Sequence, residues 1–418
     1  MSGRHAGPGR WLGSLALGMA AACSAPERAD SPAPAPYLYV WAGDADTLDS
    51  DFLAVIDVRP GSPTYARVAS TLPVGARATT PHHTEHQLEV DHQLFANGFG
   101  AGRTFRFDLT RPAQPRLLGS FTEVGGYSFP HSFVQLPNGH MLATFQGRGP
   151  DNIPPGGLVE LDREGRFIRA TSARSEAFDS LQMRPYSLAV LPDIDRVVST
   201  STDMLADHGA HLQIWRLSDL SLLQTMELPT TSDGDGHAHE APAKTKGEDH
   251  HLFPGEPRAL ADGRTVLLAT FTCGFYRVTD FDGPAPRVEF LRAFGGENCA
   301  VPVLVGSLWL QTVPDEHAVV ALDVSDPARP REVSRVTFDS TFKPHWMAFD
   351  EGGSRVVVND GKRRLFLVDL DRRTAGLRIE ESFRDSVAVG PGVTLDRTTW
   401  PHGATGAAVP HGAVFSRP

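Results

Sequence analysis

The sequence predicts an all-β protein folded as a seven-bladed β-propeller, and three observations favour this fold class. A hairpin with a histidine at its head recurs along the chain, and an Asp followed by a turn recurs at intervals of 43 to 61 residues. The 40 Gly and 33 Pro are scattered through the 418 residues, which favours many short strands over long helices. A sheet unit that repeats every roughly 40–60 residues is typical of a propeller blade.

The clearest repeating element is the segment 130–145, which we interpret as a complete β-hairpin. Two short apolar runs flank Pro137-Asn138-Gly139, and Asn and Gly tolerate the positive φ angles of tight turns. The segment 344–358 has the same frame, again with a Pro-His pair at its head. In three such frames a His stands ten residues before the second strand: 83 to 93, 131 to 141 and 345 to 355.

An Asp marks the end of the third strand of each predicted unit. The seven positions are Asp57, Asp108, Asp162, Asp219, Asp280, Asp323 and Asp369. The segments 108–116 and 323–331 agree best, because in each the Asp is followed by two prolines and then an Arg. A β-sandwich in which such turns recur by chance is the alternative architecture.

The two ends of the chain complement each other. The first apolar segments, 37–41 and 52–57, have no His-headed strand before them, whereas Pro410-His411 heads an apolar segment at the C-terminus. We expect this C-terminal strand to join the N-terminal blade and close the ring, which removes an open sheet edge.

The N-terminal segment has the layout of a secretory signal. Arg4 and Arg10 precede an apolar run, 11–22, that ends in small residues before Cys23. The sequence Ala20-Ala-Ala-Cys23-Ser also resembles a bacterial lipobox, with Cys23 as the lipidated residue. We therefore expect a signal peptide over 1–23, a Pro-rich tether over 24–36, and a propeller over 37–418. The expected location is the periplasm, with a lipid anchor in the outer membrane.

Charge and motifs exclude several classes of function. The formal net charge of -11 and the lack of a basic stripe argue against nucleic-acid binding. The sequence has no Gly-x-Ser-x-Gly, no phosphate-binding Gly-x-x-x-x-Gly-Lys-Ser/Thr and no Cys-x-x-Cys, which argues against hydrolase and nucleotide-dependent chemistry. We expect a monomer that contacts a membrane only through its anchor.

The residues that head the innermost strands should meet at one mouth of the central channel, because the first strand of each blade lines the axis. These heads are His83, His131, Tyr186, Glu256, His345 and His411. Several imidazoles aimed at one point are suited to copper, zinc or iron. We predict a metal site of His83, His131, His345 and His411, with His86 and Glu256 in or near the ligand shell. A polar funnel without metal is the alternative.

If these histidines lie exposed at the channel mouth, replacing His131 or His345 by Ala should abolish metal retention with little effect on folding.

Cys273 and Cys299 lie in adjacent predicted units, and an exported chain favours a disulfide between them over a copper thiolate. The polar segment 229–247, with His237-Ala-His239-Glu240, is expected to be a solvated loop rather than a metal site.

Several of these segments together resemble one known family. They are Asp51–Pro63, the pair His82-His83, His131 with Leu136–Gly139, Gly156–Asp162, Asp323–Pro327 with Pro330-Arg331, and the terminal His411. With them the chain resembles the selenium-binding protein family, also known as methanethiol oxidases. The stretch 41–44 stands where family members carry the Cys associated with selenium, so the resemblance does not extend to selenium binding.

The resemblance implies a seven-bladed propeller and a copper-dependent oxidase that acts on a small thiol. Zinc and iron stay open as alternative metals, because imidazole binds all three. The rival function, from a different class, is a non-catalytic propeller that binds a protein or a cell-surface ligand.

Overall fold

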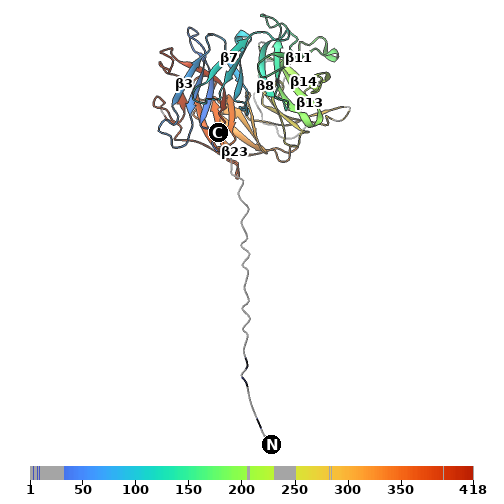
Figure 1. Ribbon diagram of the computed structural model, residues 1–418. Coiled ribbons are helices and arrows are strands. Elements are labelled where there is room, and N and C mark those ends of the chain that lie inside the picture. Colours follow the sequence, from blue (N-terminus) through green and yellow to red (C-terminus); the bar gives the residue numbers. More distant parts are fainter. Residues whose placement is uncertain are drawn as a thin grey trace.

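The protein is a seven-bladed β-propeller, as predicted (Figure 1). The computed structural model describes residues 33–204, 208–229, 251–281, 283, 285–388 and 390–417, with the isolated glycines 3, 7 and 9. Within these residues the helices are four single 3₁₀ turns: η1 (Phe99–Ala101), η2 (Glu176–Phe178), η3 (Pro192–Ile194) and η4 (Pro314–Glu316). Among the described residues, none of these turns is long and apolar enough to cross a membrane.

Each blade is an antiparallel sheet whose strands run in order from the axis outward. Blades 1 to 4 are β29 (Ala408–Phe415), β1 (Tyr37–Asp44), β2 (Phe52–Asp57), β3 (Val68–Pro73); β4 (Pro81–Thr84), β5 (Gln93–Gly98), β6 (Arg103–Asp108), β7 (Arg116–Phe121); β8 (Ser128–Gln135), β9 (Met141–Gly147), β10 (Gly157–Leu161), β11 (Phe167–Ser172); and β12 (Pro185–Leu191), β13 (Arg196–Asp203), β14 (His208–Arg216), β15 (Leu222–Glu227).

Blades 5 to 7 complete the ring. They are β16 (Pro254–Ala259), β17 (Val266–Thr270), β18 (Gly274–Thr279), β19 (Arg287–Ala293); β20 (Val303–Val305), β21 (Leu308–Val313), β22 (Ala318–Asp323), β23 (Arg331–Thr337); and β24 (Trp346–Asp350), β25 (Arg355–Asn359), β26 (Arg364–Asp371), β27 (Gly376–Ile379), with β28 (Val393–Thr394) also paired to β26.

The C-terminal strand closes the ring, which confirms the prediction. Strand β29 is the innermost strand of blade 1 and pairs antiparallel with β1, with Leu38 opposite Phe415 and Asp44 opposite Ala408. The two ends of the chain are therefore held in one sheet, and the innermost position of blade 1 does not remain an open edge.

The predicted repeats appear as local structure. The second strands of three blades begin at Gln93, Met141 and Arg355, ten residues after the histidines, as expected. Asp108 accepts a hydrogen bond from the Thr110 N–H at 2.9 Å and pairs with Arg116, so the Asp holds the turn and also links the third strand to the fourth.

Blade 6 uses the same arrangement, in which Asp323 accepts from Ser325 N–H at 2.9 Å and pairs with Arg331 at 2.9 Å. Blade 4 departs from it, because β14 ends at Arg216 and Asp219 lies three residues beyond.

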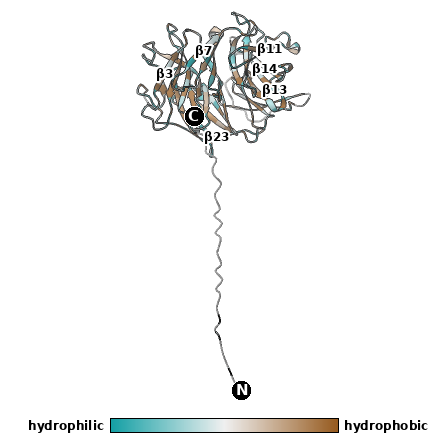
Figure 2. Cartoon of the chain, in the orientation of Figure 1, coloured by the Kyte–Doolittle hydropathy of each residue, from teal (hydrophilic) through white to brown (hydrophobic). Residues whose placement is uncertain are grey.

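Burial follows the position of a strand within its blade. Figure 2 shows the hydropathy of the residues, with hydrophobic residues along the strands of the ring. Every residue of the second strands β9, β17, β21 and β25 is buried, because adjacent blades cover both faces of the middle of each sheet. The outermost strand β7 alternates between exposed and half-buried residues, since only one of its faces is covered. This difference in burial explains why the second strands are apolar runs in the sequence and why the fourth strands mix polar and apolar residues.

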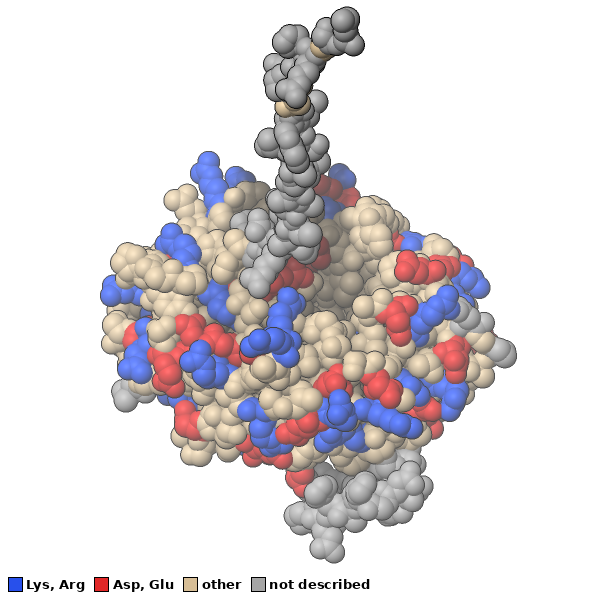
Figure 3. Space-filling model, turned by 90° about the horizontal axis from the view of Figure 1, so that it is seen from below, with Lys and Arg blue, Asp and Glu red and all other residues tan. Residues whose placement is uncertain are grey.

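Ala35, near the start of the continuous described chain, meets the ring at blade 7. Ala35 is buried, and its N–H donates to both carboxylate oxygens of Asp350 at 3.2 and 3.3 Å, while Arg355 donates to the Ala35 carbonyl at 3.1 Å. Figure 3 shows one face of the ring, with basic and acidic side chains interspersed and a hollow near the centre. The predictions for the signal peptide, for Cys23 and for His237, His239 and Glu240 lie outside the described residues.

Candidate metal centre

Innermost strands of five blades carry a proline followed by a β-bulge. The pairing register shifts between Pro81 and Thr84 in β4, Pro130 and Phe133 in β8, Pro185 and Leu188 in β12, Pro254 and Pro257 in β16, and Pro410 and Ala413 in β29. Proline has no N–H to give to a ladder, and a bulge re-aims the residues that it releases. The two residues after each proline thus leave the regular pairing.

Polar side chains on the second strands fix these released residues. Asn97 Oδ1 accepts the His83 N–H at 2.5 Å, and its Nδ2 donates to the Pro130 carbonyl of the next blade at 2.7 Å. Thr144 accepts the Ser132 N–H at 3.0 Å and donates to the Tyr186 carbonyl at 2.7 Å. Because each side chain serves two blades, it holds one head residue relative to the next.

Side chains of other second strands make similar hydrogen bonds to the next blade further around the ring. Thr200 donates to the Gly255 carbonyl at 2.8 Å, and Asn359 donates to the His411 carbonyl at 2.6 Å. Hydrogen bonds that recur from blade to blade therefore fix the backbone beside the candidate ligands.

Five imidazoles gather at the axis. The ring centroid of His83 lies 4.4 Å from His82, 4.2 Å from His131 and 5.6 Å from His411. His345 joins the group through His411, with 2.9 Å between the two Nε2 atoms. Four of the predicted histidines therefore lie close together. They come from strands of blades 2, 3 and 1 and from the residue before β24 of blade 7, and His82 of blade 2 joins them.

Glu256 supplies a carboxylate to this cluster. Its Oε2 accepts from the Ser187 hydroxyl at 2.5 Å and from Arg258 Nη1 at 2.9 Å. Its Oε1 lies 3.5 Å from His83 Nδ1 and accepts no hydrogen bond from any described residue. One carboxylate oxygen is thus fixed by the protein, and the other faces the imidazoles.

Two sets of side chains have their ligand atoms within 4.8 Å of one another. One is His83, His131 and Glu256, and the other is His82, His83 and His411. In the described part of the chain, His82 Nδ1, His131 Nε2 and Glu256 Oε1 are buried without a hydrogen-bond partner. Unpaired buried acceptors are costly, and a bound cation would satisfy them. The residues therefore fit a metal ion.

The electrostatics favour the ligand forms of these groups. Burial lowers the pKa of His131 and His345 to about 4, and burial together with the neighbouring imidazoles lowers the pKa of His83 well below its usual value. Burial raises the pKa of Glu256, but Arg258 and other hydrogen-bonding neighbours outweigh it and hold this pKa below its usual value. Neutral imidazoles and an ionised carboxylate are the forms that bind metals.

His86 lies beside the cluster with its Nε2 already in use. Arg258 Nη2 donates to this atom at 3.1 Å, while Glu256 Oε2 lies 3.6 Å away and the ring stacks on Trp346 at 4.6 Å. Arginine can only donate, so the Nε2 lone pair of His86 faces Arg258. We therefore infer that the Nε2 of His86 is not a metal-binding atom and that it helps to hold Arg258 beside Glu256, while its Nδ1 is buried without a hydrogen-bond partner among the described residues.

The structure corrects the expected exposure of the site. His131 is fully buried and His345 is half-buried, whereas both were expected to lie exposed at the channel mouth. The bulge in β8 draws His131 into the axis, where the neighbouring blades cover it. An Ala at position 131 would leave a cavity, so the expectation of little effect on folding is wrong for that substitution.

His82 is the candidate ligand that the spacing rule missed. Counting ten residues back from the second strand selects His83, but the bulge directs both residues inward. Counting from the proline would have found His82, because His131, Tyr186, His345 and His411 also directly follow a proline.

Tyr186 takes the place of a histidine in blade 4. Its hydroxyl lies 3.5 Å from His83 Nε2, and its ring centroid is 3.8 Å from that of His131. Burial raises its pKa well above the usual value, so the hydroxyl stays protonated. Tyr186 can therefore donate a hydrogen bond to His83 and limit the movement of His131.

Two further sequence features lie away from the axis. Cys273 and Cys299 form a disulfide, with 5.0 Å between their Cα atoms, so neither offers a free thiolate to the cluster. Trp41 in β1 is fully buried and donates from Nε1 to the Asn97 carbonyl at 2.7 Å. It is a packing residue between blades 1 and 2.

Fold and donor atoms together define a seven-bladed β-propeller with a histidine-rich candidate metal centre on its axis. No protein-family model matches the chain. Two relatives named methanethiol oxidase are similar to it: that of Ruegeria pomeroyi is 31% identical over 170 residues, covering 37% of this chain and 38% of its own, and that of Hyphomicrobium is 35% identical over 139 residues, covering 32% and 31%. The matched parts therefore span less than half of these curated relatives.

A solved structure supports the same fold over the whole ring. The hypothetical selenium-binding protein from Sulfolobus tokodaii superposes with a TM-score of 0.70, covering 92% of this chain and 94% of its own at 15% identity. The chain is thus a distant homologue of proteins named methanethiol oxidase and selenium-binding protein.

Proposed function

We propose that this protein is a copper-dependent oxidase of a small thiol, with the metal at the axial cluster. The observation that carries the proposal is the convergence of five imidazoles and one carboxylate, four of whose buried ligand-type atoms have no hydrogen-bond partner among the described residues. The distant homologues named methanethiol oxidase support the same reaction class.

The protein residues would hold and shield the reacting groups. His83, His131 and Glu256 would ligate the ion, and His82 and His411 offer further nitrogen atoms close to His83. His345 lies in neither set and reaches the cluster through its Nε2 contact with His411. Copper, when bound, would supply one-electron chemistry between the thiol and dioxygen. The thiol would lose two electrons and two protons, which reduce dioxygen to hydrogen peroxide. Burial of the cluster keeps bulk water away from this exchange.

Iron is the second candidate metal, for a specific reason. The set His83, His131 and Glu256 has two histidines and one carboxylate, which is the ligand set of non-haem iron oxygenases. Zinc fits the donor atoms but would not support thiol oxidation, because it has no redox chemistry.

We further propose that the protein acts outside the cytoplasm, anchored by lipid at Cys23. The basic residues and apolar run before Ala-Ala-Ala-Cys23 support this location. Labelling cells with a radioactive fatty acid tests it. A mature protein without label would exclude the anchor.

The experiment on function is metal analysis of the protein purified from its own periplasm, followed by an assay of hydrogen peroxide release on adding methanethiol. We expect about one copper per chain and peroxide release that needs both copper and thiol. Glu256→Gln should lose both, and Arg116→Gln on the outer strand β7 is the control that should lose neither. Protein without redox metal would refute the proposal and favour the non-catalytic binding propeller.

A further inference from the structure

A cavity of about 570 Å³ lies at the ends of the innermost strands, away from their proline heads. Its apolar wall comes from blades 3, 4, 6 and 7 and is formed by Phe133, Val134, Leu188, Val190, Leu304 and Phe349. Phe349, near the end of β24, lines it, and the next residue, Asp350, binds Ala35.

The inner end of the cavity is polar. His86 and Arg258 line it, and their side chains are 23% and 16% exposed. Glu256, which is 2% exposed, lies directly behind them, 2.9 Å from Arg258 Nη1 and 3.6 Å from His86 Nε2. The cavity therefore ends one side chain away from a candidate metal ligand.

The size and lining of this cavity define what it would hold. Ligand sites are typically about 300–1,000 Å³ and combine apolar walls with a few polar groups at fixed positions. Methanethiol, with one carbon, would leave most of the apolar wall in contact with water. A longer hydrocarbon chain would cover that wall while its head group reached the polar inner end.

We propose that this cavity binds an organic thiol with an apolar chain of several carbons, with its sulfur directed toward His86 and Arg258. The reaction on that thiol rests on the proposed oxidase function, but the binding does not. The walls contribute affinity in proportion to the buried chain, about fourfold in Kd for each buried methylene. Arg258 is the group that would favour an ionised sulfur over a neutral one.

Binding can be measured without turnover by using alcohols in place of the thiols and protein without metal. Metal-free protein is titrated with ethanol and with hexan-1-ol by isothermal titration calorimetry. We expect the Kd of hexan-1-ol to be at least about tenfold lower than that of ethanol. Equal affinities would overturn the proposal.

Two variants locate the binding. Val190→Trp and Leu304→Trp narrow the cavity from different blades and should each raise the Kd of hexan-1-ol at least about tenfold. Leu118→Trp, on the exposed face of β7, is the matched control and should leave the Kd unchanged. If both cavity variants fold and bind hexan-1-ol as the parent protein does, the chain lies elsewhere and the proposal is wrong.

Kinetics with copper-loaded protein then separate the two proposals. Hexane-1-thiol should have a kcat/KM at least about tenfold above that of methanethiol, and Leu304→Trp should remove this preference. Peroxide release with methanethiol alone would keep the oxidase function and overturn the chain preference. Tight hexan-1-ol binding without any thiol oxidation would keep the cavity assignment and refute the oxidase function.

Discussion

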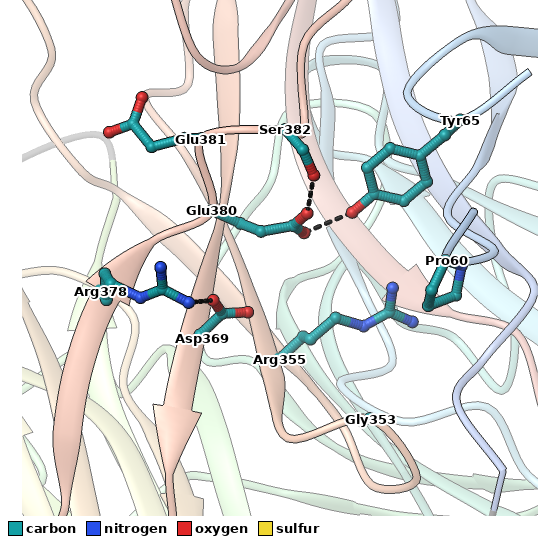
Figure 4. A pocket seen from close by; sticks show the side chains of 9 residues that line it. All are labelled: Pro60, Tyr65, Gly353, Arg355, Asp369, Arg378, Glu380, Glu381 and Ser382. Carbon is teal, nitrogen blue, oxygen red and sulfur yellow. Dashed lines mark hydrogen bonds and ion pairs between the residues drawn. The ribbon is translucent and has the colours of Figure 1, made fainter. Parts of the chain in front are cut away.

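The axial cluster and a cavity at the rim between blades 1 and 7 differ in how fully their polar side chains are paired. The rim cavity, of about 500 Å³, holds Asp369, Glu380 and Glu381 beside Arg355 and Arg378 (Figure 4). Glu380 accepts hydrogen bonds from Tyr65 and Ser382, and Asp369 pairs with Arg378 at 2.7 Å. Its two innermost carboxylates are thus paired by the protein itself.

The axial cluster is more deeply buried and yet less well satisfied. Among the described residues, its atoms His82 Nδ1, His131 Nε2 and Glu256 Oε1 lack hydrogen-bond partners. Buried polar groups are normally paired, and unpaired ones need a reason. The number of charges therefore does not identify a ligand site, whereas unpaired donor atoms on a backbone fixed by hydrogen bonds do.

Beside the rim cavity, polar contacts close the ring. Buried Arg355 pairs with Asp350 at 2.6 Å and donates to the carbonyls of Val58 and Ala35 at 2.6 and 3.1 Å. These contacts join blade 7 to blade 1. The polar groups of the rim thus serve folding, and we expect those of the axis to serve metal binding.

The largest expected effect comes from removing residues 409–418, which changes both regions. Blade 1 would lose its innermost strand and the axis would lose His411, so we expect aggregation or loss of cooperative unfolding. Thermal unfolding followed by circular dichroism measures this. Removing only residues 417–418 is the control and should change the midpoint little. An unchanged midpoint for the longer deletion would refute ring closure by β29.

Breaking the buried ion pair beside the rim should be the next largest effect. Arg355→Met leaves Asp350 buried without its partner, which should cost about 3–5 kcal/mol of unfolding free energy. Metal content should stay at the parent level. The control Arg378→Met removes a surface ion pair whose Arg is 77% exposed, and should cost less than about 1 kcal/mol. Denaturant unfolding and metal analysis are the measurements, and similar costs for both variants would contradict the distinction.

His131→Gln should have the reverse signature. It keeps most of the buried volume but removes a candidate ligand, so we expect metal retention to fall at least tenfold. The unfolding free energy of the metal-free protein should change by less than about 2 kcal/mol. Parent-like metal content in a folded His131→Gln protein would remove His131 from the ligand set.

The smallest effect should come from His86→Ala. Because the Nε2 of His86 faces Arg258, we expect full metal stoichiometry at saturation and an increase of about tenfold in the metal Kd, as for residues that orient ligands. Competition titration with a chelator measures the Kd. Loss of stoichiometry, as expected for Glu256→Gln, would show that His86 is itself a ligand.

The blade pattern follows from local signals in the amino-acid sequence. Turn residues such as Asn138 and Gly139, the Asp108 and Asp323 repeats, and the ten-residue spacing behind three histidines are local signals. Local backbone preferences set strand and turn positions, so these signals predicted the strand starts and the blade count. The Pro-His head at 410–411 also predicted closure of the ring.

Which donor atoms are free to bind a metal depends on tertiary contacts. The bulge after each proline turns His82 inward beside His83, the neighbouring blades bury His131, and Arg258 occupies the Nε2 of His86. Each of these facts depends on contacts between strands far apart in the chain. Spacing along one strand identifies the residue that heads a blade. The register of the bulge and the packing of the seven blades determine where the imidazole nitrogens of that residue point and which of them already have a hydrogen-bond partner.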